Sequence, residues 1–535
     1  MNRFLKGAMI LTIAGIIVKV IGAFSKVFIA RILGGEGIGL YQMAYPIYQM
    51  IVSIAVSGIP VAISIMIAEK LANEDMRGID KTFKVSLMLL TTVGAIFGIG
   101  MFVLADYLVE WGIITDPRAL LGIKALAPAI FVVTLLSCFR GYFQGFQYMV
   151  PTGTSQVFEQ TFRVVTMVGL AYLLIDRGLH WAAAGATFAT FPGVLAGVVV
   201  LGYFYYRQRH VRHELRATQN SESIEESTST VVKRLIALAI PVSMANIVMP
   251  IVMLIDMAIV PRRLMDIGYY MNEATTQFGY LTGMATSLVG LPIILTTSLA
   301  ASLVPAVSES AALHKLDDIN HRSKMAMKIA NLFTIPACVG LSVLATPVSQ
   351  MIYNTPHAGP AIAVMSLSIV LLGAQQITAA ILQGLGRTVI PMVTIFIGLL
   401  VKVFLDYELT AIPELGINGA AWATNIFFGL AAILNFIFVK RYIGSIVPKV
   451  ELIKIILSAM AMGGMASVMY SFLLTLVGNA LAVGFTIVGA IVTYGATLWL
   501  TRAITRGDLY NMPIIGKRLL AKKRQEEVEL YDEEY

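Results

Sequence analysis

The feature that most constrains this chain is a series of about fourteen long apolar runs, separated by short segments rich in charge, glycine or proline. Lipid tolerates only helices or closed barrels, and a helix needs about 20 apolar residues to span the hydrocarbon core. The runs are continuous and lack the alternation of barrel strands. The sequence therefore predicts an all-α polytopic membrane protein with about 14 transmembrane helices. Their approximate cores are residues 9–33, 42–68, 83–105, 119–143, 152–175, 182–206, 234–260, 276–305, 325–352, 360–384, 389–410, 416–439, 452–476 and 480–501.

Composition and motifs narrow the class of protein further. Of the 535 residues, 57% are hydrophobic and 13% are charged, against about 25% charged in an ordinary soluble domain. Cys138 and Cys338 lie in apolar runs without His or acidic neighbours at metal-ligand spacing, so no metal site is expected. A P-loop, an HExxH motif and a nucleophile elbow are all missing from the sequence. These features favour a transporter over an enzyme, without a cofactor and driven by Na+, H+ or the membrane potential.

Basic residues mark one side of the membrane. With the N-terminus inside, 29 of the 39 Lys and Arg residues fall in cytoplasmic segments, 5 in external segments and 5 within spans. This asymmetry follows the positive-inside rule and predicts that both termini are cytoplasmic. The net charge of +8 then reflects topology, and no nucleic-acid partner is expected. Arg3 and Lys6 precede the first run, which lacks a cleavage site and is interpreted as an uncleaved helix.

An internal repeat divides the chain into two halves. Gln144-Gly145 recurs as Gln383-Gly384 and Arg163-Val164 as Lys402-Val403, both at an offset of 239 residues. A GA…AT motif in the sixth span recurs in the twelfth at an offset of 234. Both halves begin inside and hold an even number of spans, so we expect parallel repeats and alternating access. The predicted organisation is residues 1–206, N-lobe; 207–233, cytoplasmic linker; 234–440, C-lobe; 441–505, extra helix pair; and 506–535, charged cytoplasmic tail.

Three cations lie within the first span, at Lys19, Lys26 and Arg31. The seven-residue spacing places Lys19 and Lys26 on one helical face, with Arg31 about 140° further round. No acid on that helix pairs with them, and charges inside a membrane are functional candidates. A diphosphate would fit such a set of cations. Snorkelling to the interface is the alternative, and it suits Arg31 near the outer end better than Lys19 near the middle.

Two further spans each carry an opposite-charge pair at a spacing of four residues. The fifth span has Glu159 and Arg163, and its repeat partner, the eleventh span, has Lys402 and Asp406. Pairing along one helix keeps charge in lipid at low cost. Structural neutralisation and a place in the wall of a cavity both remain open for these four residues.

The seventh span combines a lone acid with several prolines. Asp256 is a candidate carboxylate for ion or proton coupling, and pairing with Arg262 or Arg263 near the outer surface is the alternative. Pro241 and Pro250 would each remove a backbone hydrogen bond and bend the helix. Such bends suit a gating role, although static membrane bundles contain them as well.

Several stretches resemble a known family. The opening FLKGAMILTIAGIIVKVIGAFSKVFIARILGGEGIGLYQMAYPIYQ, the run SGIPVAISIMIAEKLA, LVGLPIILTTSLAASLVPAVSESAA and GINGAAWAT are similar to the stage V sporulation protein B group. That group belongs to the polysaccharide-transporter branch of the multidrug/oligosaccharidyl-lipid/polysaccharide exporter superfamily and is related to MurJ-type lipid II flippases. The resemblance covers residues 1–505 and includes the fourteen-helix count.

The resemblance implies an undecaprenyl-diphosphate-linked sugar as substrate, with peptidoglycan lipid II as the first candidate. In MurJ-like proteins, basic residues on the first helix meet the diphosphate. Lys19 matches the first such position, Ser25 the next with Lys26 beside it, and Arg31 also has a counterpart. The family's arginines on helices two and eight have no match, because Gln49 occupies the second-helix region and FGYLTGMATS the eighth. The resemblance also implies that spans thirteen and fourteen form a groove for the prenyl tail.

Three classes of function follow as alternatives. The first is a flippase for lipid II or another lipid-linked oligosaccharide of a capsule, teichoic acid or spore polymer. The second is a drug/cation antiporter, which would more often have twelve helices and an acidic cavity. The third is a membrane-embedded glycosyltransferase, which would need a substantial external loop. For the first class we expect a monomer in the bacterial cytoplasmic membrane, with the lipid bilayer, the glycan substrate and cell-wall synthesis proteins as partners.

Overall fold

The computed structural model describes residues 3–209 and 226–503, and within these ranges the chain forms helices and no strand. The all-α polytopic class predicted from the apolar runs is therefore confirmed. Most of the predicted linker, residues 210–225, and the predicted charged tail from residue 504 onward lie outside the described residues. The side chains of Arg3 and Lys6 lie outside them as well.

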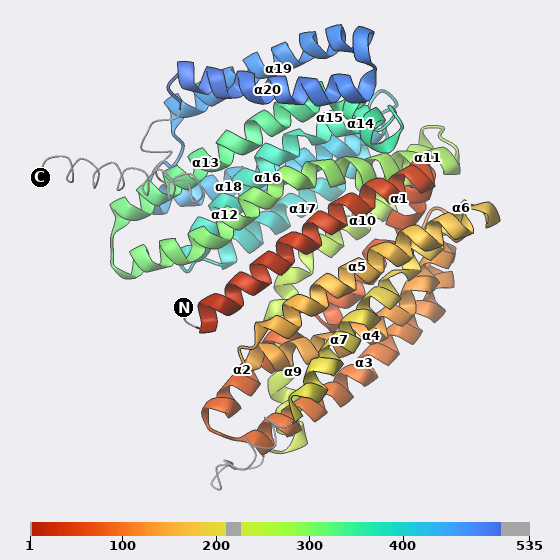
Figure 1. Cartoon of the computed structure of the whole chain (residues 1–535), viewed down its shortest axis with the longest axis vertical. Coiled ribbons are helices and arrows are strands. Elements are labelled where there is room, and N and C mark those ends of the chain that lie inside the picture. Colours follow the sequence, from red (N-terminus) through yellow and green to blue (C-terminus); the bar gives the residue numbers. More distant parts are fainter. Residues whose placement is uncertain (1–2, 210–225, 504–535) are drawn as a thin grey trace, which may run out of the picture. The chain divides into compact units, whose positions relative to one another are not determined.

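The helices follow one another in the order shown in Figure 1. From the N-terminus they are α1 (Arg3–Ala55), α2 (Ile59–Ala72), α3 (Met76–Glu110), the short η1 (Pro117–Ala119), α4 (Leu120–Gly145), α5 (Met149–Leu174), the short η2 (Ile175–Arg177), α6 (Leu179–Phe188) and α7 (Thr190–Arg207). After residue 226 they are α9 (Thr228–Asn246), α10 (Val248–Asp266), α11 (Met271–Phe278), the π-helical η3 (Gly279–Ala285), α12 (Thr286–Ala312), α13 (Leu316–Val343), α14 (Ala345–Tyr353), α15 (Gly359–Met365), α16 (Leu367–Gly384), α17 (Val389–Leu409), α18 (Ile417–Ile443), α19 (Lys449–Val477) and α20 (Asn479–Leu500).

The number of membrane-spanning helices is lower than the sequence predicts. In the part of the chain that the structure describes, twelve helices are long and apolar enough to cross a bilayer, or thirteen if the bent pair α9–α10 forms one span. The predicted count of fourteen is not confirmed. One reason lies at the N-terminus, where Ile10–Ala72 forms a single candidate span of 63 residues and includes the first two predicted spans. At about 1.5 Å per residue this run is far longer than one crossing requires.

A kink at Gly34 interrupts the helical geometry of α1. Gly34 has φ 63° and ψ −172°, whereas the residues on either side continue the helix. A side chain at this positive φ would clash with the backbone, so glycine is the residue that permits the kink. The break falls where the sequence predicts the end of the first span, after residue 33.

Other breaks fall inside predicted spans. A turn at residues 56–58 separates α1 from α2 within the predicted second span. Helices α6 and α7 meet at Ala189, and α15 and α16 meet at Ser366. Helices α9 and α10 meet at Ile247 with a bend of 55°. These spans are apolar throughout, and hydropathy alone does not reveal where their helices change direction.

The chain divides into two compact units. The first comprises Met1–Leu291, Ile352–Met365 and Ile395–Phe427. Within it α1 runs alongside α5, and α4 packs against α2, α3 and α7 (Figure 1). Its core is built largely from aliphatic side chains of α2, α3, α4 and α7, together with an aromatic cluster of Phe83, Phe139, Tyr142 and Tyr205. The predicted division into lobes, linker and helix pair stays a prediction.

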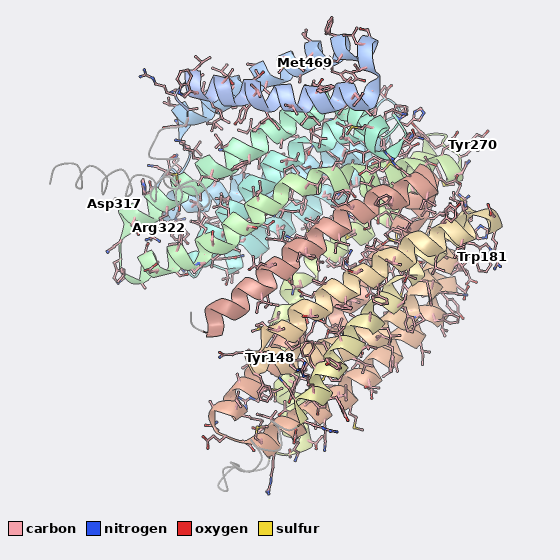
Figure 2. All side chains as sticks on the ribbon, viewed as in Figure 1. Tyr148, Trp181, Tyr270, Asp317, Arg322 and Met469 are labelled. Atoms are coloured by element: carbon pink, nitrogen blue, oxygen red, sulfur yellow. The ribbon has the colours of Figure 1, made fainter. Side chains whose placement is uncertain are left out.

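The second unit comprises Pro292–Met351, Ser366–Thr394 and Phe428–Tyr535. In its described part, α13 packs against α16 and α19, and α19 and α20 lie side by side (Figure 1). The Tyr494 hydroxyl donates to the Leu332 carbonyl oxygen at 2.9 Å and so ties α20 to α13. Figure 2 shows Asp317 and Arg322 together near one end of α13, where charged side chains replace the apolar ones of its middle.

Candidate functional site

The cations of the first predicted span differ in whether other residues of the protein already bind them. Lys19 and Lys26 are exposed on α1, and neither has a hydrogen-bond or ion-pair partner among the residues that the structure describes. Arg31 is also exposed, but its Nε donates to the Ile352 carbonyl oxygen at 2.7 Å. Since a charge in an apolar span is costly without a counter-charge or water, Lys19 and Lys26 are the described cations of the first predicted span that remain available to a ligand.

The opposite side of α1 packs on α5. Ala14 and Ser25 are buried there, and the Ser25 hydroxyl donates to the Gly22 carbonyl oxygen at 2.7 Å. Ser25 occupies a position at which the resemblance implies an arginine, yet its side chain faces the packed side. Lys26 is exposed because each helical residue is turned by about 100° from the last.

A cluster of three charges joins α4 to α5. The Glu159 carboxylate accepts from Arg163 Nη2 at 2.5 Å and from Arg140 Nη2 at 2.7 Å. The Arg140 guanidinium also reaches the Ser155 hydroxyl at 3.4 Å. All three charged side chains are largely buried, and the formal charge of the cluster is +1. The i,i+4 pair predicted from the sequence is present, with a second arginine added to it.

Arg140 is the member of this cluster that the sequence analysis missed. It lies near the end of the predicted span 119–143 and within α4, and it was not among the predicted site residues. The arginine side chain then reaches the carboxylate on the neighbouring helix. Three tyrosines, Tyr41, Tyr45 and Tyr48, follow one another along α1. Successive rings of these tyrosines lie 5.8 Å apart, centroid to centroid.

A second buried cluster joins α10, α17 and α18. Lys402 Nζ lies 2.6 Å from Asp256 Oδ1, 2.8 Å from Asp406 Oδ2 and 3.2 Å from the Thr424 hydroxyl. The Lys402 and Asp406 side chains are completely buried and Asp256 is 16% exposed. The structure thus brings together three of the predicted site residues. The formal charge of this second cluster is −1, opposite in sign to that of the Arg140–Glu159–Arg163 cluster.

The structure gives Asp256 a partner other than the two arginines considered from the sequence. The carboxylate contacts Lys402, while Arg263 Nη1 contacts Asp266 at 2.6 Å. The Arg263 guanidinium also lies over the Tyr407 ring at 3.9 Å from its centroid. Asp256 is therefore held by the neighbouring helix and not by the arginines that follow it in the sequence.

Gln49 and the two prolines lie elsewhere on the first unit's helices. Gln49 is partly buried on α1, two turns beyond Gln42, whose side-chain amide donates to the Thr282 carbonyl oxygen at 2.7 Å. Pro250 lies in the first turn of α10, directly after the 55° bend, where a missing N–H costs no helical hydrogen bond. Pro241 lies in α9, and its side chain falls outside the described residues.

Charged residues tie α2 to α9. The Lys70 ammonium is buried between Glu226 at 3.3 Å and Asp75 at 3.8 Å. Arg234 contacts Glu69 and also reaches Glu226 at 3.5 Å. At the other end of α9, the Asn246 amide donates to the Ser57 hydroxyl in the turn before α2, at 2.8 Å. These contacts link the helices that precede the predicted linker to the first helix after it.

A separate polar cluster ties α1 to α11. The buried Asp116 carboxylate accepts from Arg118 at 2.7 Å and from the Thr275 hydroxyl at 2.9 Å. Arg118 also contacts Glu36 of α1 at 2.7 Å. The backbones come unusually close here, since a Cβ at Gly279 would overlap the carbonyl oxygen of Gly35. Small residues of this kind allow such close helix packing within a membrane.

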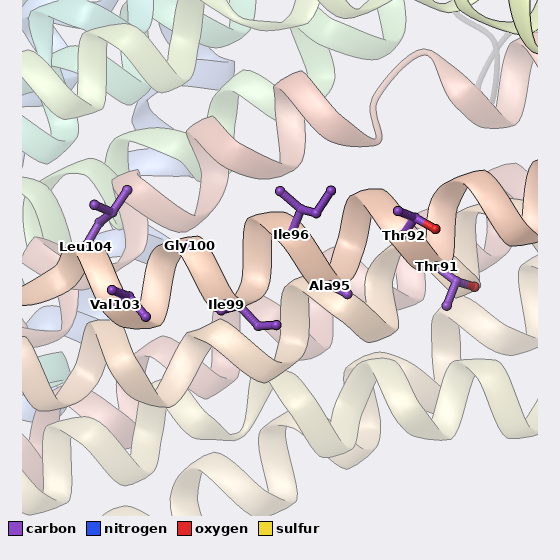
Figure 3. A pocket seen from close by; sticks show the side chains of 8 residues that line it. All are labelled: Thr91, Thr92, Ala95, Ile96, Ile99, Gly100, Val103 and Leu104. Atoms are coloured by element: carbon purple, nitrogen blue, oxygen red, sulfur yellow. The ribbon is translucent and has the colours of Figure 1, made fainter.

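The second unit contains an apolar hollow of about 440 Å³. Asn331 and Cys338 of α13 are its polar members, and the other lining residues are apolar side chains of α13, α16, α18, α19 and the segment before α19. A larger but shallow hollow of about 750 Å³ runs along α3 of the first unit (Figure 3). Two threonines, Thr91 and Thr92, are its polar side chains, and both hydroxyls donate to their own helix backbone. The α3 hollow therefore offers little to a polar ligand.

The sequence of this chain matches two family models and several proteins of Bacillus subtilis. The polysaccharide biosynthesis protein family model matches residues 4–311, and the MatE family model matches residues 281–408. Stage V sporulation protein B of Bacillus subtilis (strain 168) is 30% identical over 532 residues, which is 97% of this chain and 99% of that protein. Lipid II flippase MurJ of the same organism is 26% identical over 478 residues, covering 86% of this chain and 87% of that protein.

Solved structures share the fold. Lipid II flippase MurJ in an inward closed conformation matches with a TM-score of 0.70 at 16% identity, covering 92% of this chain and 99% of that one. An inward-facing multidrug resistance MATE family transporter matches with a TM-score of 0.67 at 17% identity, covering 80% and 95%. This protein is thus a multi-pass membrane protein of the transporter fold shared by MurJ and MATE proteins. The chain belongs to the polysaccharide biosynthesis protein family, within the multidrug/oligosaccharidyl-lipid/polysaccharide exporter superfamily.

Proposed function

We propose that this protein is an alternating-access flippase that moves an undecaprenyl-diphosphate-linked sugar precursor, peptidoglycan lipid II, from the inner to the outer leaflet of the bacterial cytoplasmic membrane. The observation that carries the proposal is a pair of exposed cations in the first apolar run, Lys19 and Lys26, which have no partner among the residues that the structure describes. Cations face lipid at high cost, so these two are best explained by a water-filled path and an anionic ligand.

The geometry of this pair suits a diphosphate. Seven residues of helix separate the two Cα atoms by about 10 Å along one face. Lysine is a flexible point charge that binds phosphate oxygens, and two such side chains can converge on one diphosphate. Arg31 is the third cation implied by the resemblance, and it already donates to the Ile352 carbonyl oxygen.

The prenyl tail needs a separate, apolar place. The hollow of about 440 Å³ against α13, α16 and α19 offers an almost wholly apolar lining in the unit that also contains α20. In this proposal α19 and α20 hold the tail in contact with lipid while the headgroup crosses. Outward movement of an anionic headgroup is favoured by an inside-negative membrane potential, at about 2.3 kcal/mol per charge per 100 mV. In this proposal both termini are cytoplasmic, as the distribution of basic residues predicts.

Complementation of a bacterium depleted of its lipid II flippase tests the proposal. The wild-type gene should restore growth, and the double variant Lys19→Ala/Lys26→Ala should fail although it inserts into the membrane at the normal level. Lys19→Arg/Lys26→Arg is the matched control, because it retains both charges and should restore growth. Full complementation by the double alanine variant would contradict the diphosphate role. Rescue of a capsule or teichoic acid defect alone would move the substrate to another lipid-linked glycan.

A drug/cation antiporter is the second candidate. The MatE family model matches residues 281–408, and a MATE transporter shares the fold. The buried acids Asp256 and Asp406 would be its coupling groups. Resistance to cationic drugs in a strain that lacks its own efflux pumps, without growth of the flippase-depleted strain, would favour this candidate over the flippase.

A further inference from the structure

Lys402 sits inside a shell of oxygen atoms. Its Nζ lies 2.6 Å from Asp256 Oδ1, 3.0 and 2.8 Å from the two Asp406 carboxylate oxygens, and 3.2 Å from the Thr424 hydroxyl oxygen. Three helices, α10, α17 and α18, contribute these atoms. The ammonium is completely buried, so the protein alone supplies its surroundings.

Two carboxylates around one ammonium leave an excess of negative charge. Burying one unpaired carboxylate is strongly unfavourable, and burying two close together is worse because they also repel. The Lys402 ammonium is therefore the positive charge that keeps this part of the first unit together. Carboxylate and hydroxyl oxygens are also the ligands that hard metal cations prefer.

The internal repeat supplies a natural comparison. Arg163 is the counterpart of Lys402 at the offset of 239 residues. Its cluster has two cations and one carboxylate, whereas the Lys402 cluster has one cation and two carboxylates. Glu159 is the carboxylate of the Arg163 cluster, and Arg140 also binds that carboxylate at 2.7 Å. Loss of the Arg163 charge would leave Glu159 neutralised by Arg140, whereas loss of the Lys402 charge would leave Asp256 and Asp406 without a cation.

We propose that the Lys402 ammonium is a tethered cation at a two-carboxylate site, present in place of an exchangeable monovalent cation. Asp256, Asp406 and Thr424 form the site. When the Lys402 side chain is removed, this site would bind a monovalent metal ion or a small alkylammonium ion. The wild-type cluster then neither binds nor releases Na+ during transport. This inference does not depend on the identity of the transported substrate.

Thermal unfolding of the purified full-length protein in lipid nanodiscs tests this site. Wild type should unfold at the same temperature in NaCl and in choline chloride of equal ionic strength. Lys402→Ala should unfold at a lower temperature in choline chloride and recover part of the loss in NaCl or methylammonium chloride. Arg163→Ala is the matched control and should show no difference among these salts. Lys402→Met should not recover, because its side chain fills the space that the ion needs.

Direct binding of radioactive Na+ gives an independent readout if Lys402→Ala does not fold. The wild type should bind no more Na+ than Asp256→Asn. Saturable binding to the wild type that Asp256→Asn removes would overturn the proposal. A folded Lys402→Ala protein whose unfolding temperature is the same in all three salts would overturn it as well.

Discussion

Arg163 and Lys402 are counterparts in the predicted internal repeat, and each anchors a buried charge cluster of three residues. Around Arg163 the cations are in excess, and around Lys402 the carboxylates are. Each cluster crosses from one helix to another, so its charges also fix how those helices pack. The two lysines of α1 differ from both clusters because they have no partner among the described residues.

The Arg140–Glu159–Arg163 cluster predicts a large effect of one substitution. Glu159→Gln removes the carboxylate that both guanidiniums share and should lower the free energy of unfolding by about 3 kcal/mol. Thermal unfolding in detergent measures this loss. Adding Arg140→Gln removes one of the two stranded charges and should restore part of the stability. An unchanged unfolding temperature for Glu159→Gln would show that water or lipid headgroups, and not this carboxylate, satisfy the two arginines.

Local spacing was enough to predict some of these contacts and not others. The pairs Glu159–Arg163 and Lys402–Asp406 follow from the i,i+4 geometry of any helix. Asp256 lies far from Lys402 in the sequence, and its contact depends on how α10 packs against α17. Single-sequence periodicity carries no information about that packing, so the nearer Arg262 and Arg263 were the partners that could be considered.

At the scale of elements, the bend between α9 and α10 and the kink at Gly34 separate straight segments of the first unit. Polar contacts join neighbouring segments. The ion pair between Arg234 and Glu69 joins α9 to α2, and the contacts of Asp116 with Arg118 and Thr275 help to join α1 to α11. Alternating access requires that at least one such contact opens during transport. The kink coincides with the predicted end of the first span, and the bend at Ile247 lies between Pro241 and Pro250, the prolines expected to bend the seventh span.

A reversible cross-link tests whether the contact between the last residue of α9 and the turn before α2 opens. Ser57→Cys/Asn246→Cys, in a protein whose Cys138 and Cys338 are replaced, puts two thiols where the native side chains contact at 2.8 Å. Oxidation should form a disulfide and stop transport, and a reducing agent should restore it. Each single cysteine variant is the control and should be insensitive to the oxidant. Undiminished transport by the fully cross-linked protein would mean that this contact stays closed throughout the cycle.

At the scale of the whole molecule, the apolar runs were enough to predict an all-α membrane protein, because lipid leaves a long apolar segment little choice but a helix. The count of fourteen spans was not confirmed, since several runs contain breaks or merge across a kink. The membership of the family rests on matches along nearly the whole chain. The proposed substrate rests on a few charged side chains, chiefly Lys19 and Lys26, and is the central claim to test.

Flipping in proteoliposomes tests this claim most directly. Purified wild-type protein, reconstituted with lipid II on one leaflet and an inside-negative potential, should move the lipid to the other leaflet faster than protein-free vesicles do. Lys19→Arg/Lys26→Arg should retain most of this rate, and Lys19→Ala/Lys26→Ala should fall to the protein-free rate. Movement of lipid II by the double alanine variant at the wild-type rate would contradict the account.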